Sequence, residues 1–180
     1  MNRRSLLCLG GCAAFALPAL TAALTPLSAA AATDMPVSDA DRAFVAMVSQ
    51  GGMFEVEASK VASEKAARQD ITDIGFTEVH DHQLVGAKLL SIAASIGMHV
   101  DTTLNADFSK RLDRLRGLSG KAFDNAYLEE MVTIHAADGA AFAKEAQSGS
   151  HPALRAFAAE TVLIVRRHQG SLNALPLETV

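Results

Sequence analysis

The chain has 180 residues, 49% of them hydrophobic, and a formal net charge of −4 at neutral pH. This length suits one domain with a sizeable core, and an acidic chain is a poor partner for nucleic acid, whose phosphates attract clustered lysine and arginine. Its two cysteines are Cys8 and Cys12, so the chain beyond them can form neither a disulfide nor a thiolate metal site.

Residues 1–32 have the pattern of a signal peptide. Arg3 and Arg4 precede an uncharged run that continues to Thr33, and Ala30, Ala31 and Ala32 supply small residues that suit a signal peptidase. Cleavage there would leave 14 basic and 20 acidic residues, a net charge of −6. The run is also long enough to span a bilayer, so a retained anchor in the envelope is the alternative.

Two further features of this segment leave the export route open. The arginine pair resembles the twin-arginine signal for folded proteins but lacks its usual flanking residues. The sequence LGGC, which ends at Cys12, resembles a lipoprotein cleavage site, although apolar sequence continues beyond it. We expect a periplasmic mature protein that begins near Thr33 and has no transmembrane span.

Beyond the signal we expect a short linker at 33–37, one domain at 38–176 and a tail at 177–180. The domain opens with two stretches of helical periodicity. The first runs from Ser38 to residue 66 and starts with a capping pair, Ser38 and Asp41. The second runs from Asp70, its predicted cap, to Gly97. Only a few residues separate them, so the two helices should lie antiparallel.

Residues 98–119 form a longer connection. Phe108, Leu112 and Leu115 recur in it at helical spacing, which predicts a short amphipathic helix. A helix of roughly 27 residues is about 40 Å long, and a connection of about 22 residues can cross that distance. The connection therefore permits the crossover of ferritin-like bundles but does not require it.

Two more helices are predicted at 120–149 and 151–175, the second with Pro152 in its first turn. The short link between them again indicates an antiparallel pair. The sequence thus predicts an all-α protein: a ferritin-like four-helix bundle whose long connection between the second and third helices carries a short helix.

Several polar side chains are predicted to point into this bundle. At about 100° per residue, Glu78 and His82 fall in the centre of the second helix's apolar stripe. His80 points outward, and Asp81 lies at the edge of the stripe. On the first helix, Glu55 lies near the middle of the apolar face.

The third and fourth helices contribute three more inward groups. His168 lies within the apolar stripe of the fourth helix, while Asp138 lies centrally on the less regular face of the third, with His135 to one side. Inward groups of the first pair of helices lie roughly 12–18 Å from the turn that joins them, and those of the second pair roughly 15–24 Å from theirs. Both sets therefore fall near the middle of the bundle.

A buried carboxylate without a partner is costly, so these groups need partners. Glutamates, histidines and an aspartate from four helices resemble the ligands of di-iron or di-manganese carboxylate bundles, and such donors suit iron, manganese or zinc. The hypothesised metal ligands are Glu55, Glu78, His82, His135, Asp138 and His168. A metal-free network in which glutamates and histidines share protons would satisfy the same groups and is the alternative.

Other motifs indicate no chemistry. His99 and His151 fall in turns and are expected to be exposed. The segment GLSGKAF has the wrong spacing for a phosphate-binding loop, and no Gly-x-Ser-x-Gly motif occurs. We identify no catalytic residue from the sequence.

Four segments resemble a bacterial family of exported domains of unknown function: SQGGMFEVEASKVASEKA, DHQLVGAKLLSIAASIG, LSGKAFDNAYLEEMVTIHAADGAAFAKEA and PALRAFAAET. Members are often labelled predicted outer membrane proteins and are assigned a ferritin-like four-helix fold. The resemblance implies an envelope protein whose polar core includes His82, His135 and His168. It implies no established activity.

The expected function is therefore that of an exported helical bundle that binds a divalent metal and has a redox or stress role. The alternative is a non-enzymatic envelope interaction or structural protein with a metal-free Glu–His core. An envelope partner or an oligomer is compatible with both.

Overall fold

The computed structural model describes residues 35–178, and the predicted signal peptide lies outside this part of the chain. The described residues form five helices: α1 (Asp39–Lys65), α2 (Gln69–Ser95), α3 (Ala106–Arg116), α4 (Gly120–Ser148) and α5 (Pro152–Asn173). The all-α prediction is confirmed, and the helix ends differ from the predicted ones by only one or two residues, as usual for helix boundaries.

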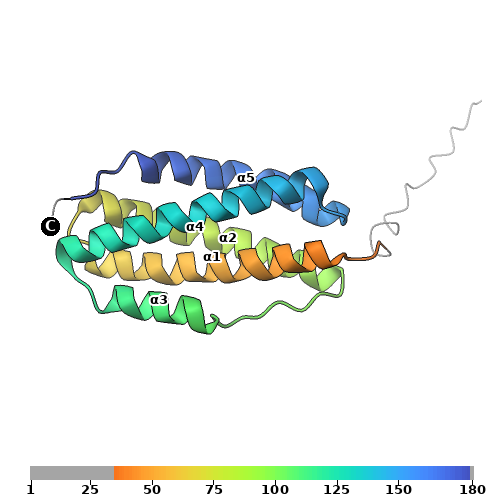
Figure 1. Ribbon diagram of the computed structural model, residues 1–180, viewed down its shortest axis with the longest axis horizontal. Coiled ribbons are helices and arrows are strands. Elements are labelled where there is room, and N and C mark those ends of the chain that lie inside the picture. The colour runs from red at the N-terminus through yellow and green to blue at the C-terminus, as the bar shows by residue number, and fades with distance from the viewer. Residues whose placement is uncertain (1–34, 179–180) are drawn as a thin grey trace, which may run out of the picture.

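The long helices α1, α2, α4 and α5 lie side by side as a four-helix bundle, and α3 lies along its side (Figure 1). Each short link joins an antiparallel pair, α1 with α2 and α4 with α5. Helices α2 and α4 run in the same direction, so the connection that carries α3 returns along the length of the bundle (Figure 1). This is the crossover of ferritin-like bundles, which the sequence permitted without requiring.

The start of α1 follows the predicted capping pair. The backbone N–H of Asp41 donates to the Ser38 hydroxyl at 3.1 Å, and the Ser38 N–H donates to the Asp41 carboxylate at 2.8 Å. The start of α2 differs from the prediction, because Arg68 rather than Asp70 is the N-cap residue and its side chain makes no capping bond.

A distant acid binds the backbone that leads into α2. The carboxylate of Asp124, on α4, accepts hydrogen bonds from the backbone N–H groups of Ala67 and Arg68 at 3.1 and 3.0 Å. This acceptor comes from another helix, so the local pattern of the sequence could not indicate it.

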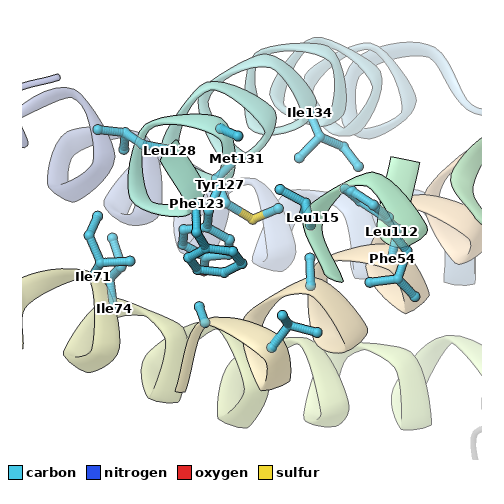
Figure 2. Close-up of a cluster of buried hydrophobic side chains, with 14 of the residues drawn as sticks. Phe54, Ile71, Ile74, Leu112, Leu115, Phe123, Tyr127, Leu128, Met131 and Ile134 are labelled. Carbon is cyan, nitrogen blue, oxygen red and sulfur yellow. The ribbon is translucent and has the colours of Figure 1, made fainter. Parts of the chain in front are cut away.

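The apolar core has two regions, one toward each end of the bundle. Figure 2 shows the first, in which Phe54 of α1 and Leu112 and Leu115 of α3 meet Phe123 and Tyr127 of α4. The second region is centred on aromatic and aliphatic residues of α1, α4 and α5, which are Phe44, Phe142, Leu154 and Phe157. Along α2, α4 and α5 the predicted ligands lie between these two regions, and on α1 Glu55 lies beside Phe54, at the border of the first region.

One turn residue departs from its prediction. His99 is exposed as expected, but His151 is fully buried. His151 is the N-cap residue of α5, and its Nδ1 accepts a hydrogen bond from the Ala153 N–H at 3.3 Å. A histidine in a tight turn between two packed helices is thus enclosed by the helices it joins.

Across residues 35–178, no helix is both long enough and apolar enough to cross a membrane.

Candidate metal centre

All the predicted metal ligands are buried. Their exposed fractions range from 0% to 6%, for Glu55, Glu78, His82, His135, Asp138 and His168. The neighbouring His80 points outward with 72% of its side chain exposed, as predicted. The helical periodicity therefore identified the correct faces, including the less regular face of α4.

Four of these residues meet at one point. Glu78 and His82 lie one turn apart on α2, His135 comes from α4 and His168 from α5, and one donor atom from each lies within 4.8 Å of the others. The Glu78 Oε2 atom is 3.0 Å from His82 Nε2 and 3.2 Å from both His135 Nε2 and His168 Nδ1. The last two nitrogens are 3.3 Å apart.

Glu55 lies behind two of these histidines. Its carboxylate is 3.0 Å from His82 Nδ1 and 3.2 Å from His135 Nδ1, the ring nitrogens that face away from the meeting point. His135 Nδ1 also lies 2.9 Å from the backbone carbonyl of Met131 and donates a hydrogen bond to it. Glu55 and Met131 therefore favour the tautomers that carry a proton on Nδ1.

Asp81 has the same role for the third histidine. Its Oδ2 atom accepts a hydrogen bond from His168 Nε2 at 2.9 Å and another from Arg167. The pKa of Asp81 is lowered to about 2 because hydrogen bonds from His80, His168 and Arg167 outweigh the effect of burial, which raises it. An ionised Asp81 holds the proton of His168 on Nε2, so its Nδ1 presents a lone pair.

These tautomers place four electron-pair donors face to face. With protons on the outer nitrogens, the inner nitrogens of His82, His135 and His168 and the Glu78 oxygen all present lone pairs to one another. Within residues 35–178, neither Glu78 oxygen nor His82 Nε2 has an aligned hydrogen bond, despite the short contacts. Such groups repel unless positive charge, as a metal ion or as protons, lies among them.

The spacing of the donor atoms matches a small metal ion. Ligands placed 2.0–2.1 Å from a tetrahedral zinc ion are about 3.3 Å apart. The Glu78 oxygen lies 3.0–3.2 Å from the three histidine nitrogens, the nitrogens of His135 and His168 are 3.3 Å apart, and all four donor atoms lie within 4.8 Å of one another. Three imidazoles and one carboxylate also suit zinc, iron or manganese, so both the geometry and the chemistry of this set fit such an ion.

The pKa values of Glu78, His135 and Glu55 all differ from their usual values. Burial raises the pKa of Glu78, but its close contacts with His135, His168 and His82 outweigh this effect and hold the pKa well below its usual value. Burial lowers the pKa of His135, but Glu78 and Glu55 outweigh it and raise that pKa. Burial raises the pKa of Glu55 well above its usual value, although the charge of His135 opposes this.

Asp138 lies outside the set of four. Its Oδ2 atom packs against α1, 3.0 Å from where a Cβ at Gly51 would lie. Burial raises its pKa to about 6, with the charges of His135 and His82 opposing. The structure thus brings Glu78, His82, His135 and His168 together, with Glu55 as an outer neighbour and Asp138 farther along the bundle.

Sequence reasoning missed two partners of the cluster. Asp81 was placed at the edge of the apolar stripe of α2, a position from which it reaches His168 of α5. That edge position was a usable signal, because acids beside an inward histidine orient its ring in many metal sites. The carbonyl of Met131 had no signal, since the sequence does not show which backbone groups a side chain contacts.

Comparisons with known proteins give a family and a fold. No curated protein has a significant match to this chain. A crystal structure of a DUF305 fragment from Deinococcus radiodurans superimposes with a TM-score of 0.67 at 11% sequence identity, covering 77% of this chain and 96% of that one. At this identity the likeness shows the fold alone. The family model of a domain of unknown function, DUF4142, matches residues 26–175, and the chain therefore belongs to the DUF4142 family.

Proposed function

We propose that this protein is a periplasmic helical bundle that binds a divalent transition metal ion through Glu78, His82, His135 and His168. One observation supports this most strongly. Four donor atoms lie within 4.8 Å of one another, with the Glu78 oxygen 3.0–3.2 Å from each histidine nitrogen, while the far side of each imidazole faces its own acceptor. Metal-binding histidines usually have this arrangement, because the outer acceptor fixes the tautomer and makes the inner nitrogen a better ligand.

The outer residues would tune the bound ion. Glu55, Asp81 and the Met131 carbonyl would hold the three rings in place, and the surrounding helices would limit access of water. An iron or manganese ion held there would supply redox chemistry, whereas zinc would supply a Lewis acid. A redox or stress-related role corresponds to the first case.

A metal-free polar core is the second candidate, and the electrostatics support it. The raised pKa of His135 and the lowered pKa of Glu78 are also what a charged histidine–glutamate pair would produce without metal. Protons would then supply the positive charge among the four donors. The protein would be a structural or interaction component of the envelope, and its buried polar groups would fix how the helices pack.

Metal analysis and thermal unfolding of the mature protein, purified without a histidine tag, separate these candidates. We expect about one metal ion per chain, a melting temperature that rises with zinc, iron or manganese, and a decrease with chelator. Binding to the folded state alone adds about 2.7 kcal/mol at a hundredfold excess over Kd. The His82→Ala variant should lose this response, whereas His99→Ala, which removes an exposed histidine, should keep it.

A wild-type protein that neither copurifies with metal nor responds to metal and chelator would rule out metal binding. The metal-free polar core would then be the remaining candidate, and a separate outcome is expected for it. His82→Ala should still destabilise the protein, because Glu55 and Glu78 would lose a partner.

Export to the periplasm is supported by the signal-like segment at residues 1–32. Mass spectrometry of the periplasmic fraction should find a mature N-terminus near Thr33. An intact N-terminus in the membrane fraction would instead indicate a retained anchor, and a lipid on Cys12 would indicate a lipoprotein.

A further inference from the structure

A cavity of about 710 Å³ lies beside the metal centre, between α1, α2 and the connection that follows α2. Its inner end reaches Glu55, His82 and Asp138, and its outer end reaches the surface near Thr102. The wall between these ends includes the apolar residues Val48, Val56, Val85, Leu89, Phe142 and Phe157. The volume is in the range of small-molecule sites, about 300–1,000 Å³.

A glycine keeps part of this wall open. Gly86 lies in the middle of α2 and lines the cavity, and a Cβ added there would have no heavy atom within 4 Å. Glycine inside a helix costs about 1 kcal/mol relative to alanine. Alanine or leucine would therefore favour the helix, and leucine would extend into the open space beside Gly86.

The inner end offers hydrogen-bond acceptors. Glu55 and Asp138 both line it, and both are almost fully buried. Among the described residues, neither oxygen of Glu55 has an aligned hydrogen bond. An anionic ligand would lose its hydration in this apolar cavity and would find the oxygens of two carboxyl groups at its inner end. A hydroxyl group could donate to them without carrying a charge into the apolar cavity.

We propose that this cavity binds an uncharged apolar molecule that carries a hydroxyl group, such as an aliphatic alcohol. The aliphatic part would lie along the apolar wall, and the hydroxyl would donate to Glu55 or Asp138 at the inner end. A cationic head is disfavoured, because a charge loses its hydration on the apolar path. The site is formed by the protein alone, so binding does not depend on the metal ion proposed above.

Displacement of the neutral fluorophore N-phenyl-1-naphthylamine from the mature protein tests this. We expect saturable fluorescence that 1-decanol abolishes, with decanoate and decylamine at least tenfold weaker as competitors. The titration is run on chelator-treated and on zinc-loaded protein. Alcohol binding to both forms supports the inference whether or not metal binding is found, and binding that occurs only with zinc would contradict it.

Two matched glycine variants locate the site. Gly86→Leu should weaken decanol at least tenfold by filling the cavity, without loss of folding, because leucine is the better helix former. Gly170→Leu is the control, since Gly170 is also a helical glycine with open space around it but does not line the cavity. Equal binding by the two variants would overturn the proposal.

A third variant tests the polar end. Asp138→Asn has nearly the same shape but removes one carboxyl group. In this variant the difference in affinity between decanol and decanoate should therefore be smaller than in the wild-type protein. Decanoate or decylamine that competes as well as decanol against the wild-type protein would contradict the proposed ligand class.

Discussion

Two buried polar clusters in this molecule satisfy their charges in different ways. The first is the metal centre in the middle of the bundle. The second, which we call the end cluster, consists of Asp41, Glu145 and His151, where the start of α1 meets the turn between α4 and α5. In the end cluster Asp41 accepts hydrogen bonds from Ser38 and from the backbone N–H groups of Ser150 and His151.

The comparison teaches how to recognise a functional polar cluster. Backbone N–H groups at helix ends satisfy Asp41, which is an ordinary structural role. In the metal centre the short contacts of Glu78 are with ring nitrogens that also present lone pairs, and within residues 35–178 no helix end supplies donors to it. Acceptors that face acceptors need positive charge between them, as a metal ion or as protons, whereas an acceptor that faces N–H donors, as Asp41 does, needs none.

Loss of the end cluster should have the largest effect on stability. Asp41→Ala removes the acid of the capping pair of α1 and leaves the N–H groups of Ser38, Ser150 and His151 without their acceptor, so we expect a loss of about 3 kcal/mol in the free energy of unfolding. Chemical denaturation measures this, with Asp39→Ala as an exposed control in the same helical turn. The Asp41→Ala variant should still be stabilised by metal. If it is not, the end cluster and the metal centre are not independent.

The second prediction concerns the metal-dependent part of stability. Glu78→Gln removes the carboxylate that contacts all three histidines. It should abolish the metal-dependent gain of about 2.7 kcal/mol at a hundredfold excess of metal. Isothermal titration with zinc checks this, and the exposed Asp73→Asn on the same helix is the control. If the Glu78 variant binds zinc as tightly as the wild type, the ligand set is wrong.

The third prediction tests an orienting residue. Asp81→Asn keeps the four ligands but weakens the hold on His168. Loss of such an outer partner typically costs 10–100-fold in metal affinity, or about 1.4–2.7 kcal/mol. Titration should show weaker binding with unchanged stoichiometry. If the affinity for zinc is unchanged, Asp81 does not orient His168, and its role is limited to its contacts with His80 and Arg167.

The smallest effect is expected in the end cluster and depends on pH. Burial, together with the neighbouring Asp41, raises the pKa of Glu145 to about 7. Protonated Glu145 is favoured in the folded state, so its stabilising contribution is complete below the unfolded pKa and is lost as the pH rises through about 7. Glu145→Gln should therefore stabilise the protein above pH 7 by about 1–2 kcal/mol, with little effect near pH 4.

Thermal unfolding across this pH range measures the effect of Glu145→Gln. Glu129→Gln, an exposed substitution on the same helix, provides the baseline. A Glu145 variant whose stability follows the pH dependence of the wild type would show that this carboxyl group does not titrate differently on folding.

Much of the candidate site could be predicted because helical periodicity is a local property. The side chains of Glu78 and His82 must point inward if the apolar residues around them do. The depth estimate worked for the same reason, since the helical rise is constant and the turns are short. The long-range pairings were not predictable in this way: Asp124 binding the backbone before α2, Asp81 holding His168, and the burial of His151.

By itself, the sequence determined the helices, their inward faces and the polar residues on those faces, because each depends on neighbours within a few turns of chain. Only the tertiary structure decided that α2 and α4 run in the same direction and which ring nitrogens meet. It also separated Glu55 and Asp138 from the set of four. The rotation and axial shift of one helix against another depend on how whole surfaces pack, and a shift of a few ångströms decides whether a side chain is a ligand or a neighbour.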